Sequence, residues 1–550
     1  MPVPSAAAAA PHRLSVDLRR LPWITALAAD YAETFDTLAP FFAGNPGLPE
    51  DWASAIARAQ AHTRPREAIA AVLVQQQRRR AAPQAAIAAA EQLTDPRTVA
   101  IVTGQQAGLF GGPLYALLKA LTTVQLAERV ARDHRVPAVA VFWIDAEDHD
   151  WDEVRSCAVL DGDLARRIVS LDRPEGAGER PVARIPLDES ATAAVATLAG
   201  LLPGTEFSKG LLADLGRAYA PGTGMADAFG RWLEAVLGNR GLVVYDASDP
   251  AAKPLAGHVF VSELENPEWT LRLAAETGEA LRGRGYHAQV VPQAHGVALF
   301  SLDGGRQPIR AASNGFVVGT TAVSRASLVS RARERPESFS PNVLLRPIVQ
   351  DTLFPTIAYV PGPNELAYLA QLKPVYERFG VPMPLFCPRA TATLVDSAGM
   401  KFLNRYPLPF EGLQPNNEAL LNHLLESHLP SSIEQAYQDA AVSIEGGMTA
   451  LIDAAPAIDP TLQGAARSTL SRMQHDLQTL HAKIIHAAKR RDDTLRRQFQ
   501  RTRGQAFPDG IPQERGIGFV YFLNKYGPAL VDRLLEDLPL DPGRHWILSI

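Results

Sequence analysis

Six carboxylates surround one histidine in the segment DAEDHDWDE, residues 145–153. Like charges at this spacing repel one another unless a cation, an ammonium group or water lies among them. A substrate amine fits this requirement, because an acid can orient the amine while the imidazole accepts its proton. The segment therefore predicts three catalytic residues, which are His149, Asp150 and Asp148.

Two other interpretations of the acidic segment stay open. Mg²⁺ binds one or two carboxylates together with water and phosphate, so a divalent metal is an open question. No side chain is assigned as a metal ligand. Carboxylates are also common in the first turn of a helix, where the helix dipole stabilises them and solvent surrounds them.

The segment GQQAGLFGGP, residues 104–113, carries four glycines. Glycine lets the backbone approach a ligand closely, and the start of the following helix favours an anion. We therefore predict that Gly104, Gly108, Gly111 and Gly112 bind a phosphate or a nucleotide. The segment matches neither the GxGxxG fingerprint nor the P-loop, and the alternative is a structural glycine-rich turn.

Five polar side chains are predicted to bind substrate. Gln105 and Gln106 each offer two donors and one acceptor to a hydroxyl or amide group. Arg346, with Asn342 close by in sequence, can hold a carboxylate or phosphate through two hydrogen bonds. Glu365 follows a Pro-Gly-Pro-Asn turn. The alternatives are a structural ion pair for Arg346 and an ordinary helix-terminal acid for Glu365.

Apolar runs place these motifs on a parallel sheet. Residues 98–103 and 138–144 are predicted strands joined by a helix over 114–133, and 138–144 is apolar on both faces. A second unit combines a strand at 356–360, a helix at 365–379 and a strand at 383–387. Parallel strands end at the same sheet edge, so we expect the 104–112 bend and His149 to share one cleft. The predicted fold class is a Rossmann-like, doubly wound α/β core.

The chain divides into six predicted segments. They are an N-terminal helical segment packing on the core (1–95), the first half of the core (96–154), an inserted connecting peptide with a strand near 182–186 (155–240), the second half of the core with an inserted hairpin (241–414), a helical coiled-coil domain (415–505) and a segment returning to the core (506–550). In the coiled-coil domain, Leu470, Met473, Leu477, Leu480 and Ile484 recur at heptad spacing. This seam packs either within its own domain or against a second copy.

The composition is that of an ordinary globular protein. A net charge of −5, with 46% hydrophobic and 21% charged residues, gives no sign of a nucleic-acid or membrane surface. No apolar run approaches the roughly 20 residues of a membrane span. The two cysteines lie far apart in sequence, which fits the reducing cytoplasm.

The motifs together resemble the BshC family of bacillithiol biosynthesis cysteine-adding enzymes. The resemblance rests on GQQAGLFGGP, on AEDHD at 146–150 and on QERGIGFVYFLNKYG near the C-terminus, and it spans nearly the whole chain. The chain departs from the family at 361–365, where PGPNE replaces the expected GGPGE. The resemblance implies a Rossmann-like core, connecting-peptide insertions and a C-terminal coiled coil that forms a homodimer.

The implied reaction joins the carboxyl group of cysteine to the amine of glucosaminyl-malate. Condensing a free carboxylate with an amine in water requires activation, so ATP or another activated donor is expected. Two other functions stay open. They are a metal-assisted amide hydrolase or transferase, and a non-catalytic nucleotide-binding scaffold for thiol synthesis.

Overall fold

The computed structural model describes residues 12–291, 295–427, 431–491 and 493–550. It forms two compact units. The core unit comprises Pro11–Val395 and Ile511–Ile550, and the helical unit comprises Asp396–Gly510. Among the described residues, no helix combines the length and the apolar character that a membrane crossing requires.

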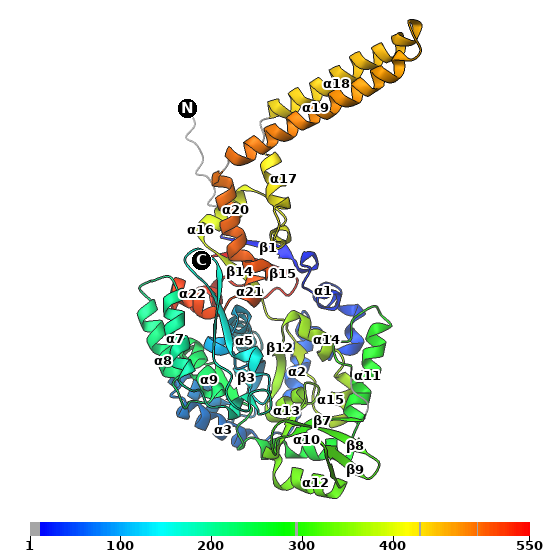
Figure 1. Ribbon diagram of the computed structural model, residues 1–550. Helices are drawn as coiled ribbons and strands as arrows, with labels where there is room; N and C mark the ends of the chain where they lie inside the picture. The colour runs from blue at the N-terminus through cyan, green and yellow to red at the C-terminus, as the bar shows by residue number, and fades with distance from the viewer. Residues whose placement is uncertain (1–11, 292–294, 428–430, 492) are drawn as a thin grey trace. The chain divides into compact units, whose positions relative to one another are not determined.

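A five-stranded parallel sheet lies at the centre of the core unit, in the order β13-β12-β2-β3-β6 (Figure 1). Its strands are β2 (Val99–Gln106), β3 (Ala138–Asp145), β6 (Val243–Asp246), β12 (Thr356–Val360) and β13 (Leu385–Phe386). The chain runs outward from β2 through β3 to β6, then returns to the other side of β2 as β12. The strand order therefore reverses between β2 and β12, which is where doubly wound folds bind their ligands. The predicted fold class is confirmed.

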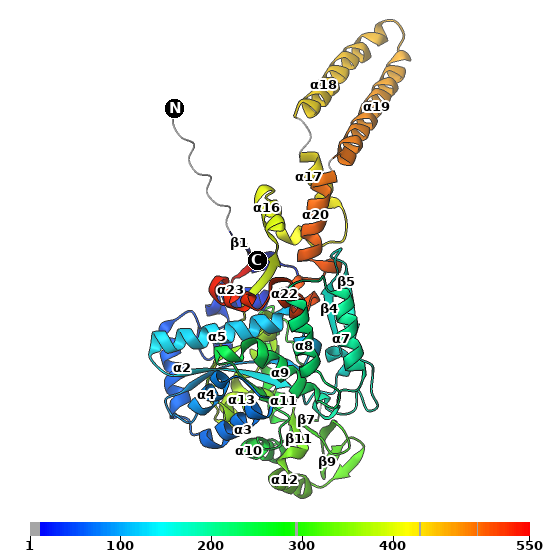
Figure 2. The ribbon, with the colours of Figure 1, turned by 90° about the vertical axis from the view of Figure 1, so that its left-hand side faces the viewer.

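Helices cover both faces of this sheet (Figures 1 and 2). Alternate side chains of each strand point to opposite faces, so Ile101 joins one apolar cluster and Val102 the other. The first cluster includes α2 (Pro49–Ala61), α5 (Leu114–His134) and α9 (Met225–Leu237). The second includes α3 (Arg66–Arg79), α10 (Lys253–Glu265) and α13 (Arg346–Leu353).

The other helices of the core unit surround these layers. They are α1 (Ala26–Glu33), α4 (Gln84–Gln92), α6 (Trp151–Val154), α7 (Ser190–Leu201), α8 (Ser208–Ala218), α11 (Trp269–Arg282), α12 (Arg325–Glu334), α14 (Leu366–Leu369), α15 (Lys373–Phe379), α21 (Gln513–Gly516), α22 (Phe519–Tyr526) and α23 (Ala529–Asp537).

Three smaller sheets complete the core unit. An antiparallel sheet contains β7 (Gly296–Ser301), β8 (Gln307–Ala312), β9 (Gly315–Val318), β10 (Thr321–Val323) and β11 (Phe339–Pro341). A hairpin joins β4 (Ser156–Leu160) to β5 (Arg166–Ser170). In the third sheet, β15 (Arg544–Ser549) lies between β1 (Arg13–Asp17) and β14 (Thr391–Val395).

Three local predictions differ from the structure. Residues 13–17 form β1, whereas the sequence predicted only helices before residue 95. The strand predicted at 182–186 is a 3₁₀ turn over Val182–Arg184, because the Val182 and Ala183 N–H groups donate to carbonyls of the acidic segment, not to a strand. The helix predicted over 365–379 is interrupted between α14 and α15.

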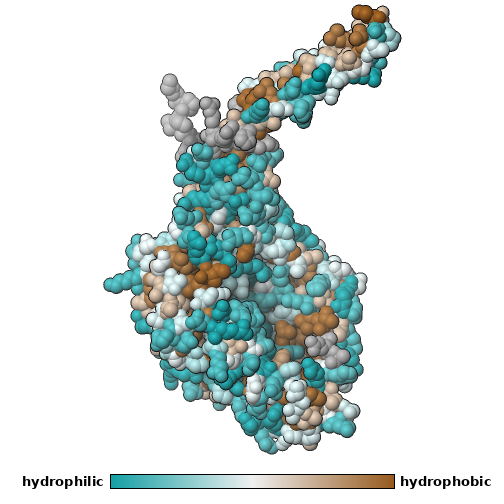
Figure 3. All heavy atoms as spheres, viewed as in Figure 1, coloured by the Kyte–Doolittle hydropathy of each residue, from teal (hydrophilic) through white to brown (hydrophobic). Residues whose placement is uncertain are grey.

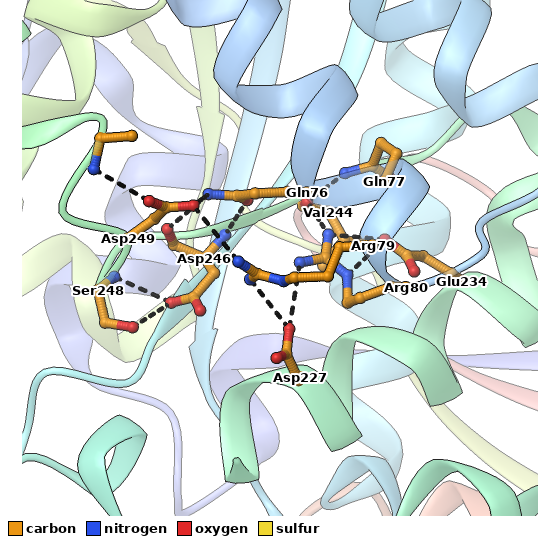
Figure 4. Close-up of polar contacts among 11 residues, drawn as sticks. Gln76, Gln77, Arg79, Arg80, Asp227, Glu234, Val244, Asp246, Ser248 and Asp249 are labelled. Carbon is orange, nitrogen blue, oxygen red and sulfur yellow. Dashed lines mark hydrogen bonds and ion pairs between the residues drawn. The ribbon is translucent and has the colours of Figure 1, made fainter. Parts of the chain in front are cut away.

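Polar side chains of α3 cover the open edge of β6 (Figure 4). An unpaired sheet edge otherwise invites pairing with another chain. Gln77 Nε2 and Arg80 Nη2 each donate to the Val244 carbonyl at 2.6 Å, and Gln76 Oε1 accepts from the Asp246 N–H at 2.8 Å. Arg80 also pairs with Glu234 of α9 at 2.7 Å, and both side chains are buried.

The Arg80 contacts predict a large cost for its removal. Arg80→Leu leaves the buried Glu234 carboxylate uncompensated, so we expect urea unfolding to show a loss of about 3–5 kcal/mol. Arg78→Leu on the same helix is the control, because Arg78 is 66% exposed and meets Glu91 only at 3.5 Å. The control should change stability by less than about 1 kcal/mol. Equal losses in the two variants would contradict this account of the β6 edge.

The described residues of the helical unit form five α-helices, and two of these, α18 and α19, pack as an antiparallel hairpin (Figure 1). They are α16 (Ser397–Arg405), α17 (Ala419–Ser427), α18 (Ser431–Ala454), α19 (Leu462–Arg491) and α20 (Asp493–Ala506). Across the hairpin, the Tyr437 and His481 rings stack with centroids 4.0 Å apart. Apolar side chains stay exposed along it, including Val442 and Leu480 at 70% and 54% (Figure 3). The predicted C-terminal coiled-coil domain is confirmed.

Candidate functional site

A buried lysine connects the end of β2 to the loop that follows β12. Lys119 of α5 donates from Nζ to the Gly104 carbonyl at 2.9 Å, to Gln105 Oε1 at 3.2 Å and to Glu365 Oε1 at 2.5 Å. Burial lowers the pKa of Lys119, while the Glu365 carboxylate acts in the opposite direction. These bonds bring Gln105 and Glu365, both predicted to bind substrate, to the point where the strand order reverses.

Sequence reasoning missed Lys119. Its only local signal is a single lysine in the otherwise apolar run LYALLKAL, residues 114–121. A buried lysine needs an anionic or carbonyl partner, but that partner lies 246 residues away in sequence.

Gly104 lets β2 lie close to its neighbours at this point. A Cβ atom built on Gly104 would lie 3.2 Å from the Trp143 carbonyl oxygen and 3.6 Å from the Tyr359 hydroxyl. The first of these contacts is tighter than side chains normally make. A larger residue at 104 would therefore push apart the strands that position the two loops.

The backbone N–H groups of the glycine-rich bend are engaged within the protein. Gly108 donates to the Gln106 carbonyl, Gly112 to the Leu109 carbonyl, and Gly111 to the Gly108 carbonyl and the Tyr219 hydroxyl. A phosphate at the bend would have to displace these bonds, so this conformation does not fit a phosphate cradle. The assignment of Gly104, Gly108, Gly111 and Gly112 to a phosphate or nucleotide stays a prediction.

The bend and the acidic segment are joined by hydrogen bonds. Gln106 Nε2 donates to Asp148 Oδ2 at 3.1 Å, and Asp148 Oδ1 lies 2.9 Å from His149 Nδ1. Arg306 Nη1 lies 3.4 Å from both Asp148 Oδ1 and His149 Nδ1. The structure thus brings three predicted residues, Gln106, Asp148 and His149, into one network, with Arg306 as a member that the sequence did not suggest.

The network keeps the Asp148 carboxyl group ionised. Desolvation opposes ionisation of Asp148, but Arg306 and the hydrogen bonds from His149 outweigh it and hold the pKa of Asp148 below its usual value. A carboxylate facing Nδ1 favours the imidazole tautomer with its proton on Nδ1. In this tautomer, His149 Nε2 carries the lone pair that can accept a proton.

Two predicted residues serve local backbone geometry. Asp150 Oδ1 accepts from the Glu153 N–H at 3.1 Å and starts α6. Asn342 Oδ1 accepts from the Leu344 and Leu345 N–H groups at 3.0 and 3.1 Å. Neither oxygen is aimed at the Gln106–Asp148–His149 network, and the catalytic role of Asp150 and the substrate role of Asn342 stay predictions.

Arg346 is buried beside the ends of β3 and β12. Its Nη2 donates to the Tyr359 hydroxyl at 3.3 Å, its Nη1 to Gln350 Oε1 at 3.1 Å, and its guanidinium lies 5.7 Å from the Trp143 ring centroid. Desolvation raises the pKa of Asp145, and Arg346 is the largest influence that opposes this rise. Arg346 can therefore stabilise negative charge at this strand end.

Another acid of the segment is structural. Glu147 is buried and accepts from Lys253 Nζ at 2.5 Å and from Ser340 Oγ at 3.1 Å. Within the described residues, no three His, Cys, Asp or Glu side chains converge as a metal site requires. The described residues therefore offer no set of ligands that would support the magnesium interpretation.

A cavity opens beside this network, and we call it the Gln106 pocket. Its cavity volume is about 150 Å³. It is lined by Gln105, Gln106, Gly108, Gly112, Pro113, Tyr115, Glu153, Val154, Ser156, Cys157, Ala158, Arg166, Ile168, Arg515, Gly516, Ile517 and Gly518. His149 does not line the pocket. Asp148 connects it to Gln106 through the hydrogen bonds described above.

The comparisons with known proteins cover nearly the whole chain. Residues 14–390 match the model described as "Bacillithiol biosynthesis BshC, N-terminal Rossmann-like domain", and residues 392–550 match "Bacillithiol biosynthesis BshC, C-terminal coiled-coil domain". The chain belongs to the BshC family. The network and the Gln106 pocket are therefore features of a BshC-family protein.

Relatives match along nearly their full lengths. The protein of Salinibacter ruber named "Putative cysteine ligase BshC" is 36% identical over 536 residues, which cover 95% of this chain and 96% of the relative. The protein of the same name from Koribacter versatilis is 33% identical and covers 95% and 97%. The one from Chlorobaculum tepidum is 35% identical over 82% of each chain.

The Lys119 contacts give a testable prediction. Lys119→Met removes the donor that Gly104, Gln105 and Glu365 share, so we expect urea unfolding to show a loss of about 2 kcal/mol or more. Lys209→Met is the control, because Lys209 is exposed on α8 and has no side-chain partner among the described residues. If Lys119→Met unfolds like the control, Lys119 does not hold the two loops.

Proposed function

We propose that this chain is the cysteine ligase of bacillithiol biosynthesis, which forms an amide between the carboxyl group of cysteine and the amine of glucosaminyl-malate. The observation that carries the proposal is membership of the BshC family along both domains. The hydrogen-bonded network of Gln106, Asp148 and His149 beside a polar pocket supports it, because amide formation needs a base at the attacking amine.

In this mechanism the amine nitrogen attacks the activated carbonyl carbon of cysteine. The C–N bond forms, the activating group leaves with its bonding electron pair, and the amine proton moves to His149 Nε2 through one intervening water, because His149 does not line the Gln106 pocket. Asp148 stabilises the resulting imidazolium through its contact at Nδ1, in the way that an aspartate supports a catalytic histidine in hydrolases. Arg306 and Gln106 hold Asp148 in place.

Activation of the cysteine carboxyl group calls for ATP or another activated donor. When bound, the donor would supply the group that leaves as the amide forms. The metal-assisted amide hydrolase or transferase and the nucleotide-binding scaffold are the competing functions. Turnover of glucosaminyl-malate by the purified protein, in the presence of a chelator, separates the ligase from both.

We also propose that the protein works as a homodimer in the cytoplasm. Apolar side chains exposed along α18 and α19 support the dimer, since a heptad seam buries such residues against a partner helix. The two unpaired, buried cysteines, Cys157 and Cys387, fit a reducing compartment.

The dimer gives a prediction of its own. We expect light scattering after size exclusion to report a dimer for the wild type and a monomer for the double variant Val442→Asp, Leu480→Asp, because charge would enter the apolar interface. Gln478→Asp, at an exposed position of α19, should stay dimeric. A dimeric double variant would contradict an interface at this hairpin.

The function is tested in bacillithiol-producing cells that lack their own ligase. We expect the wild-type chain to restore bacillithiol, whereas His149→Ala and Gln106→Ala should lower the rate of its formation by about 10²-fold or more. Their cells should accumulate glucosaminyl-malate, as thiol profiling and mass spectrometry can show. His475→Ala, exposed in the helical unit, is the control and should restore the thiol fully. Normal bacillithiol in both site variants would overturn the proposed mechanism, and failure of the wild type would overturn the function.

A further inference from the structure

The Gln106 pocket carries two arginines on one side. Arg166 starts β5 and Arg515 lies in α21, so two elements far apart in sequence bring them to the same cavity. Arg166 Nε donates to the Gly516 carbonyl at 3.0 Å, which fixes its guanidinium beside the segment that carries Arg515. The Arg515 side chain is exposed and makes no hydrogen bond or ion pair with the described residues.

The lining of the pocket also carries an acid. Glu153 of α6 lines it and interacts with Gln106, the residue that leads to Asp148 and His149. Partial desolvation raises the pKa of Glu153, and repulsion from Asp150, Asp148 and Asp145 adds to this rise. A positively charged group bound here would relieve that repulsion.

Neutral hydrogen-bonding groups line the pocket as well. Gln105 Nε2 donates to the Tyr115 hydroxyl at 3.2 Å, and both residues line the pocket together with Ser156. Hydroxyl and amide groups of this kind suit the hydroxyls of a sugar ring.

The charges of the pocket are opposite to those of the acceptor substrate. Glucosaminyl-malate carries two carboxylates on its malyl group and one ammonium on its sugar ring, with hydroxyls between. The pocket offers two guanidinium groups, one carboxylate, and amide and hydroxyl groups. A nucleotide phosphate would also suit the arginines, but it leaves Glu153 without a cationic partner.

We infer that the Gln106 pocket is the acceptor subsite: Arg166 and Arg515 hold the two carboxylates of an amino-sugar dicarboxylate, and Glu153 with Gln106 receives its amine. This inference rests on the proposed function. Arginine pairs with carboxylates through two parallel hydrogen bonds, which gives the site its preference for the malyl group. The amine is thereby placed beside the residue that connects to His149.

Binding measurements on the full-length protein test the inference. Isothermal titration with glucosaminyl-malate should show at least a tenfold weaker affinity for Arg515→Gln and for Arg166→Gln than for the wild type. Arg310→Gln is the matched control, because it makes the same charge change on an exposed position of β8 and should bind as the wild type does. Arg515→Gln is the decisive variant, since no contact of its side chain holds the fold.

Two further probes assign the ends of the ligand. Malate alone should lose affinity in Arg515→Gln and keep it in Glu153→Gln. Methyl glucosaminide, which has the amine but no carboxylate, should show the reverse. Equal effects of each variant on both probes would overturn the proposed orientation.

The outcomes separate this inference from the function on which it rests. If the wild type binds glucosaminyl-malate and Arg515→Gln and Arg166→Gln bind it as tightly as Arg310→Gln, the pocket assignment fails while the ligase function stands. If the wild type does not bind glucosaminyl-malate in the presence or absence of ATP and cysteine, the function itself fails.

Discussion

The ammonium group of Lys119 is the interaction on which the site depends. It lies in the interior at the end of β2, where the order of the sheet reverses, and it reaches a main-chain carbonyl, an amide and a carboxylate at once. A buried cation of this kind is tolerated only because those partners replace its lost hydration. The same hydrogen bonds hold Gln105 and Glu365 in place. The position of the bend therefore depends on the acceptors that the Lys119 ammonium group requires.

The acidic segment shows how neighbouring carboxylates acquire different roles from their surroundings. Glu147 faces Lys253 and joins the core to the adjoining antiparallel sheet, whereas Asp148 faces Arg306 and an imidazole. Asp150 is used by the backbone at the start of α6. Glu153 points into a cavity with two arginines. Repulsion within the segment is thus relieved by partners from several elements, and two of these partners, Lys253 and Arg306, lie far from the segment in sequence.

Much of the fold could be predicted from the sequence because its signals are local. Strands that are apolar on both faces, such as 138–144, indicate a covered parallel sheet, and the heptad seam of 470–484 indicates the helical hairpin. The contact of Gln106 with Asp148 could be foreseen as well, because the carboxyl ends of adjacent parallel strands must meet. The short strand β1 could not, because its only signal is the alternation of Leu14 and Val16.

The members of the site that escaped prediction are cations. Lys119 is hidden in an apolar helix, and Arg306 and Arg166 come from segments with no recognisable motif. Arg515 lies in QERGIGFVYFLNKYG, a segment that carried the resemblance but no predicted site residue. The role of each cation depends on the group that it faces. That group becomes known only when the fold brings distant segments together. Acidic and glycine-rich clusters, in contrast, are conspicuous in the sequence even where, as for Asp150, the side chain serves the backbone.

The late position of α21 and α22 in the chain affects how the protein is made. The Leu114 N–H donates to the Ile517 carbonyl, and Phe519 donates to the carbonyl of Gly112, so the bend after β2 is braced by residues beyond 510. The strand β15 likewise lies between β1 and β14. A ribosome that has synthesised the chain only as far as the helical unit holds a core without this brace, with the edges of β1 and β14 open. Until translation passes these segments, the nascent chain therefore exposes unpaired strand edges of the kind that associate with other chains.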